Sequence, residues 1–139
     1  MSDPFLNIPH LRLENFIQGK IVPTRRELQN LPIFIMIYSN QCGHCLKAKP
    51  DFLAFANQMN RSGKVVVAAI ANNGLPDEPE QKGVLEMMKG VLAQNGISFQ
   101  GFPTFILYHR GKYIEYDGPR STQGYLEFIQ GKTGLAQRR

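Results

Sequence analysis

The two cysteines of this chain are the side chains best suited to chemistry, and only two residues separate them. Cys42 and Cys45 enclose Gly43 and His44. Two thiols at this spacing can close a disulfide across one helical turn, and a thiolate of such a pair attacks disulfides in other molecules. The spacing therefore predicts a redox-active Cys42–Cys45 disulfide that needs no further cofactor.

A buried strand and a helix are expected on the two sides of the cysteine pair. Residues 33–38 are all apolar, which is typical of a central strand covered on both faces. Apolar residues then recur at helical spacing, at Ala48, Phe52, Phe55 and Met59. Cys42 would lie at the start of this helix, where free N–H groups and the helix dipole stabilise a thiolate. We expect Cys42 to attack and Cys45, one turn deeper, to resolve the mixed disulfide.

His44 and a metal ion offer alternative interpretations of the pair. A donating imidazole at His44 would favour the thiolate of Cys42, although His44 could equally be an exposed spacer. A Cys-x-x-Cys pair is also half of a zinc site. The chain has no second cysteine pair, and His10 and His109 do not supply ligand spacing, so we predict no metal ligands within one chain. A zinc site shared by two chains and a purely structural disulfide remain alternatives.

The remaining apolar segments alternate between strand and helix patterns. Strand patterns cover residues 16–22, 64–70, 105–108 and 113–116, and helix patterns cover 25–31, 84–95 and a segment that begins after Ser121. This order predicts an α/β fold with a central mixed sheet of four to five strands, a closing β-hairpin, and helices on both faces.

One domain is expected, spanning residues 16–134. An N-terminal lead of residues 1–15 precedes it, and a polar tail of residues 135–139 follows. Residues 72–82 are polar and rich in Gly and Pro, and they are expected to form a long loop.

Composition and charge narrow the classes of partner. The chain is 42% hydrophobic and 19% charged, with a formal net charge of +5. Its basic residues are scattered, whereas a nucleic-acid surface needs a dense basic stripe with aromatics, so no nucleic-acid partner is expected. No stretch reaches the roughly 20 apolar residues of a membrane span, and the N-terminus lacks the pattern of a signal peptide. We expect a cytoplasmic protein that acts as a monomer.

Two motifs together resemble the thioredoxin superfamily, and within it the catalytic domains of protein disulfide isomerase. Residues 42–45 (CGHC) match the isomerase active site, and residues 101–104 (GFPT) match the loop that holds a cis-proline opposite it. The resemblance covers nearly the whole chain. It implies a thioredoxin fold, protein thiols and disulfides as substrates, and a redox partner such as a thiol oxidase, a reductase or glutathione.

The resemblance also implies roles for residues around the sulfurs. The expected substrate contacts are Gln41, Phe102, Pro103 and Thr104. His44 is expected to tune Cys42, and Arg120 to promote the ionisation of Cys45. X–Pro bonds adopt the cis form at low cost, and a cis bond at Pro103 would present a backbone edge with which a substrate strand can pair. An ordinary trans proline at the start of a strand is the alternative.

The sequence departs from the family pattern at three places. Gln41 replaces the usual Trp before the first cysteine, and Met36 replaces a buried carboxylate that is thought to move protons for the deeper sulfur. Without that carboxylate, Cys45 in apolar surroundings would keep a raised pKa and attack slowly near neutral pH. Arg120 or a water molecule would have to compensate. The loop of residues 72–82 also looks longer than in the usual domain.

These departures leave a second class of function open, a non-catalytic thioredoxin-fold module that binds proteins through the proline loop. A metal-binding dimer is a third. The direction of exchange, as oxidase, isomerase or reductase, is not determined by the sequence. An isomerase-like motif in a cytoplasmic chain would suit a protein of a large cytoplasmic virus or its virion.

Overall fold

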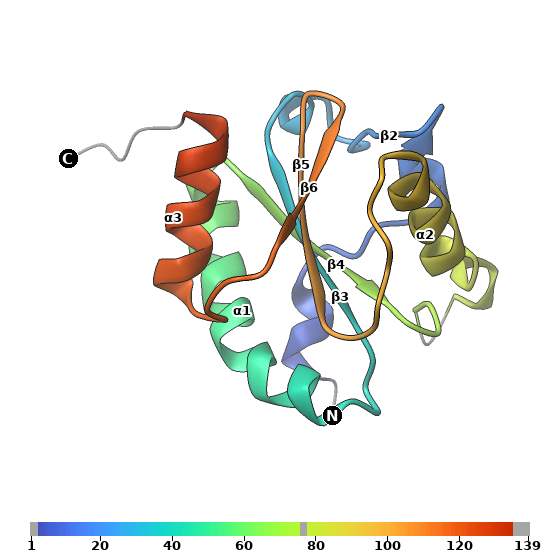
Figure 1. Cartoon of the computed structure of the whole chain (residues 1–139), viewed down its shortest axis with the longest axis horizontal. Helices are drawn as coiled ribbons and strands as arrows, with labels where there is room; N and C mark the ends of the chain where they lie inside the picture. Colours follow the sequence, from blue (N-terminus) through green and yellow to red (C-terminus); the bar gives the residue numbers. More distant parts are fainter. Residues whose placement is uncertain (1–2, 76–77, 135–139) are drawn as a thin grey trace.

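The computed structural model describes residues 3–75 and 78–134, and a four-stranded sheet lies at its centre (Figure 1). The strand order is β4-β3-β5-β6, with bounds Val66–Ala71, Ile33–Tyr38, Thr104–His109 and Lys112–Tyr116. Strand β4 is parallel to β3, whereas β5 and β6 are antiparallel to their neighbours. The predicted mixed sheet with a closing hairpin is confirmed.

Helices cover both faces of this sheet. Helices α1 (Gly43–Ser62) and α3 (Thr122–Thr133) lie on one face, and α2 (Val84–Gln94) lies on the other (Figure 1). Ser121 caps α3 as expected, since its side chain accepts the N–H of Gly124 at 3.1 Å. The three layers confirm the α/β thioredoxin fold.

Strand β3 supplies both halves of the core. Its six residues are all buried, and alternate side chains point to opposite faces. Phe34, Met36 and Tyr38 pack in the layer of α1 and α3, and Ile33, Ile35 and Ile37 pack in the layer of α2. A strand that is apolar at every position is therefore required here, as the sequence of residues 33–38 indicates.

The shorter elements differ from expectation. Residues 16–22 form a separate hairpin of β1 (Phe16–Ile17) and β2 (Lys20–Ile21), because Gln18 and Gly19 both take the positive φ of a tight hairpin turn. The helix expected over residues 25–31 is wrong, because it is only a 3₁₀ turn without a side-chain cap. The 3₁₀ helices span Pro4–Asn7, Leu13–Asn15, Arg26–Leu28 and Pro79–Gln81.

The N-terminal lead packs closely on the sheet and on α1. Phe5 and Ile8 are buried in the same apolar cluster as the residues of α1. The N–H of Leu11 donates to the carbonyl of Ala69 at 2.9 Å, and the N–H of Ala69 donates to the carbonyl of Pro9 at 2.9 Å. The lead thus continues the hydrogen bonding beyond the outer edge of β4.

The expected loop of residues 72–82 is tied to the lead. The side chain of Gln81 is buried and accepts the N–H of Leu13 at 2.8 Å, and Arg12 forms an ion pair with Glu78. Pro76 and Asp77 of this loop lie outside the described residues, as does the tail of residues 135–139.

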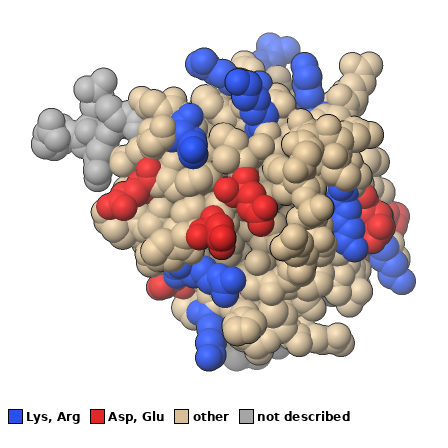
Figure 2. Space-filling model, viewed as in Figure 1, with Lys and Arg blue, Asp and Glu red and all other residues tan. Residues whose placement is uncertain are grey.

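Charges are dispersed over the face of the molecule drawn in Figure 2. On the face drawn in Figure 2, Lys and Arg side chains are spread out with carboxylates between them, so its described residues form no continuous basic stripe. Within residues 3–75 and 78–134, no helix has the length and apolar character needed to cross a bilayer.

Candidate active site

Cys42 is the N-cap residue of α1, directly after the turn that follows β3. Its sulfur accepts the backbone N–H of Cys45 at 3.3 Å. Ser39 holds the turn, because its carbonyl accepts the N–H of Cys42 at 3.3 Å and its hydroxyl accepts the N–H of Gln41 at 3.2 Å. The sulfur therefore lies against the free N–H groups of the first helical turn, as expected from the sequence.

Several groups act on the pKa of the Cys42 thiol, which is lowered from its ordinary value. The largest single effect is partial burial, which raises this pKa. It is outweighed by hydrogen bonds from the Cys45 thiol and from the backbone N–H groups of Cys45 and His44, and by the positive charge of Arg120. Cys42 is also the more accessible sulfur, so it is the better nucleophile of the two.

Cys45 lies one turn into α1 and is completely buried in the apolar layer between α1 and the sheet. The N–H of Ser39 donates to its sulfur at 3.5 Å. Burial is the main reason that the pKa of Cys45 is raised to about 11, while the Ser39 hydrogen bond and the charge of Lys49 act in the opposite direction. Near neutral pH this thiol is therefore protonated, in contrast to Cys42.

The loop before β5 lies directly against Cys42. The Cys42 thiol donates to the carbonyl of Phe102 at 3.4 Å, although the two residues are 60 positions apart. The Phe102–Pro103 peptide bond is cis, as expected. Thr104 is buried, and its hydroxyl donates to the carbonyl of Gly101 at 2.6 Å. The structure thus brings the cysteine motif and the proline loop together.

The other predicted site residues lie at the surface around the sulfurs. Gln41 and His44 are exposed next to Cys42. His44 acts on the pKa of Cys42 through its backbone N–H, and tuning by its imidazole stays a prediction. Arg120 is exposed just before α3, and its charge acts on Cys42. Its expected effect on Cys45 also stays a prediction.

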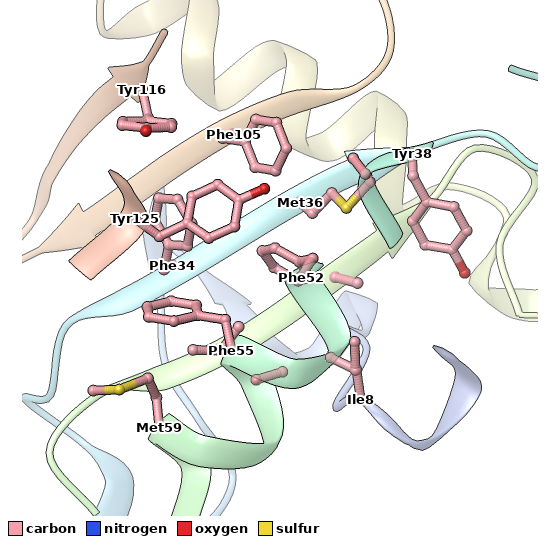
Figure 3. Close-up of a cluster of buried hydrophobic side chains, with 14 of the residues drawn as sticks. Ile8, Phe34, Met36, Tyr38, Phe52, Phe55, Met59, Phe105, Tyr116 and Tyr125 are labelled. Carbon is pink, nitrogen blue, oxygen red and sulfur yellow. The ribbon is translucent and has the colours of Figure 1, made fainter. Parts of the chain in front are cut away.

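Met36 stands where a buried carboxylate is expected, and its side chain is completely buried. Figure 3 shows Met36 beside Phe52 and Phe105, with the hydroxyl of Tyr125 pointing toward it. That hydroxyl is buried and has no hydrogen-bond partner among the residues that the structure describes. No Asp or Glu is buried in the described part of the chain, so a buried carboxylate does not serve Cys45.

Two residues near the sulfurs were not identified from the sequence. Ser39 bonds both Cys45 and the turn before Cys42. The charge of Lys49 lowers the pKa of Cys45. The available signal for Lys49 was its position four residues after Cys45, because residues at this spacing share one face of a helix.

Comparison with known proteins identifies the family. No family model matches the chain. A thioredoxin-like protein of Invertebrate iridescent virus 6 is 35% identical over 122 residues, which cover 80% of this chain and 82% of the viral protein. The chain belongs to the thioredoxin superfamily. This thioredoxin-like chain is also 33% identical over 97 residues to protein disulfide-isomerase A5 of Bos taurus, which covers 69% of the chain.

Solved structures agree with this assignment at the level of the fold. The first thioredoxin domain of mouse protein disulfide-isomerase A4 superposes with a TM-score of 0.62 at 16% identity, covering 100% of this chain and 83% of that domain structure. The chain spans only 16% of the length of the bovine isomerase. The isomerase relationship is therefore distant and concerns one thioredoxin-like domain.

Proposed function

We propose that this thioredoxin-superfamily protein is a thiol–disulfide oxidoreductase that exchanges disulfides with protein substrates through Cys42 and Cys45. The observation that carries the proposal is the contrast between the two thiols. Cys42 is accessible, capped by the start of α1 and has a lowered pKa, whereas Cys45 is buried with a pKa of about 11. An attacking thiolate and a protected resolving thiol are the two parts that such exchange needs.

In the reducing direction, the Cys42 thiolate attacks one sulfur of a substrate disulfide. The substrate S–S bond breaks, a mixed disulfide with Cys42 forms, and one substrate thiolate leaves. Cys45 then loses its proton and attacks the Cys42 sulfur, which releases the second substrate thiolate. Two electrons pass to the substrate, and the Cys42–Cys45 disulfide is left. Oxidation is the reverse, and the direction depends on the reduction potential of the pair against that of its redox partner.

The surrounding residues have supporting roles in this proposal. Gln41 and the loop of Phe102 and Pro103 contact the substrate chain beside Cys42. Thr104, which is buried, supports this contact by holding the loop through its bond to the carbonyl of Gly101. His44 favours the Cys42 thiolate, and Arg120 assists the ionisation of Cys45. The redox partner is a thiol oxidase, a reductase or glutathione.

Substitution of each cysteine tests the proposal with insulin disulfides as substrate. Cys42→Ser should abolish reduction, because no accessible thiolate remains. Cys45→Ser should accumulate mixed disulfides that are visible on non-reducing gels, because the resolving thiol is gone. Full activity of Cys42→Ser would refute the mechanism.

A protein-binding module is the second candidate, favoured by Met36 and by the raised pKa of Cys45. Both make resolution slow near neutral pH, so Cys42 would hold partners rather than release them. A binder of this kind would show saturable partner binding but no thiol-dependent turnover, and the same insulin assay distinguishes the two candidates.

A further inference from the structure

One lysine ammonium near the cysteine motif is held by contacts from several segments of the chain. Lys49 is on α1, one turn after Cys45. Its side chain is only 12% exposed. Its Nζ donates to Oδ1 of Asn40 at 2.7 Å and to Oδ2 of Asp3 at 3.2 Å. The ammonium is therefore held in one place rather than extended into solvent.

Two aromatic rings fix the same ammonium from the inner side. Nζ of Lys49 lies 4.8 Å from the ring centroid of Tyr38 and 4.9 Å from that of Phe5. Such cation–ring contacts are stronger when the charge is shielded from water. Phe5 belongs to the N-terminal lead and Tyr38 ends β3, so three separate segments, counting the turn with Asn40, surround one cation.

Through Asn40, these contacts connect Lys49 to the turn that binds the Cys45 sulfur. Asn40 directly follows Ser39, whose N–H donates to that sulfur at 3.5 Å. The charge of Lys49 lowers the pKa of Cys45, against the larger effect of burial. Tyr38 is also close enough to be affected by the Cys45 sulfur. Burial is the main reason that the pKa of Tyr38 is raised to about 12, and the charges of Asp3 and Cys45 raise it further.

We propose that Lys49 is a positioning residue that stabilises the thiolate of Cys45, and that the N-terminal lead holds it there through Asp3. The catalytic consequence rests on the oxidoreductase function proposed above. During resolution the Cys45 thiol loses its proton to solvent, and its sulfur attacks Cys42 while the substrate thiolate leaves. The positive charge of Lys49 offsets the transient negative charge on Cys45.

The other charged groups around this cation are few. The Asp3 carboxylate is the opposing charge, but its side chain is 47% exposed, so solvent screens it. Nε2 of His10 lies 2.8 Å from the Tyr38 hydroxyl, and burial lowers the pKa of His10, which favours its neutral form. Cys42 is the remaining titrating neighbour of Cys45. Lys49 thus adds a positive charge that acts on the buried sulfur, and Arg120, whose charge acts on Cys42, is a second cation at the site.

A direct titration of Cys45 tests the proposal without any catalytic assay. In a Cys42→Ser background, the ¹³C chemical shift of the labelled Cβ of Cys45 is followed against pH, because this signal is free of the overlapping absorbance of ionised tyrosines. Lys49→Met, which keeps a long apolar stem, should move the midpoint to higher pH, whereas Lys49→Arg should leave it close to the parent. Lys47→Met is the matched control, because Lys47 is an exposed lysine on the same helix.

The intact cysteine pair provides the kinetic test. Lys49→Met should slow resolution of a preformed mixed disulfide by about three- to tenfold near neutral pH, and raise the pH of its half-maximal rate. Alkylation of Cys42 near neutral pH should keep its rate, because the Cys45 thiol that donates to Cys42 stays protonated with or without the charge of Lys49. Should Lys49→Met fail to fold, Lys49→Gln retains polar contacts while removing the charge.

The outcomes separate this proposal from the proposed function. An unchanged Cys45 midpoint in a folded Lys49→Met or Lys49→Gln variant overturns the role of Lys49, whatever the exchange activity. A shifted midpoint in a protein that lacks exchange activity upholds the role of Lys49 and rejects the oxidoreductase.

Discussion

Replacing Tyr125 by Phe should stabilise the protein. The Tyr125 side chain is completely buried, and its hydroxyl has no partner among the described residues. Its ring packs against several aromatic rings, with centroids 5.2 Å from Phe34 and 5.3 Å from Phe105, and Phe would keep these contacts. A buried hydroxyl without a partner costs about 1–3 kcal/mol, so removing it should raise the free energy of unfolding by about that amount.

Tyr116 offers the matched control on the same cluster. Its ring centroid lies 5.6 Å from that of Tyr125, but its hydroxyl donates to the carbonyl of Pro119. Tyr116→Phe should therefore lose about 0.5–1.5 kcal/mol, so the same chemical change at two neighbouring rings has opposite signs.

The measurement is denaturant and thermal unfolding of the fully reduced protein. For a domain of this size, Tyr125→Phe should raise the Tm by about 3 °C for each kcal/mol gained. A Tm that falls on Tyr125→Phe, with the fold retained, would show that the hydroxyl does have a partner in solution and would refute the reasoning.

Three further predictions concern the sulfurs and the edge of the sheet. Because its pKa is lowered, Cys42 should react with iodoacetamide at lower pH than a free thiol, while Cys45 should stay unmodified until the pH approaches about 11. Mass spectrometry of the alkylated sites measures both rates, and equal rates at the two cysteines would contradict this prediction. Met36→Glu should speed resolution of the mixed disulfide near neutral pH by supplying a proton acceptor, and should lower the free energy of unfolding by about 1–3 kcal/mol because a carboxyl group is buried. Quenched-flow kinetics measures the first effect and denaturant unfolding the second. An unchanged resolution rate would mean that the Cys45 proton already has another route. Asn60→Ala should lower the free energy of unfolding by about 1–3 kcal/mol. The Asn60 side chain accepts the N–H of buried Val67 at 2.8 Å and donates to its carbonyl at 3.0 Å. An unchanged unfolding midpoint would contradict this prediction.

Much of the fold could be predicted because its signals are local. Six consecutive apolar residues at 33–38, several of them β-branched, favour a covered strand, and the apolar spacing after Cys42 fits a helix. The helix expected over residues 25–31 failed because Arg25, at its N-cap, makes no side-chain capping bond and Asn30 takes a positive φ of 75°, which ends a helix. The packing of residues 3–11 was out of reach, because it depends on hydrogen bonds to Ala69, far along the chain.

The site likewise contains features that could be predicted from the sequence and one that could not. The position of Cys42 at the start of α1 follows from chain order alone, and the loss of a carboxylate at Met36 follows from comparison with a known pattern. The location of the Lys49 ammonium could not be predicted from the sequence, because Asp3 and Asn40 hold it from two other segments. Sequence spacing places a lysine on a helix face, whereas tertiary packing determines which neighbour its charge affects.

The lead on the outer edge of β4 also bears on self-association. Strand β4 is an edge strand of the sheet, and all six of its residues are buried. An apolar edge with free backbone groups is a template for unwanted pairing with other chains. His10 bridges Ala69 in parallel register, and the adjacent hydrogen bonds occupy this edge. The outer edge of β4 at Ala69 is thereby closed to strand pairing with a second copy of the chain or with any other extended peptide.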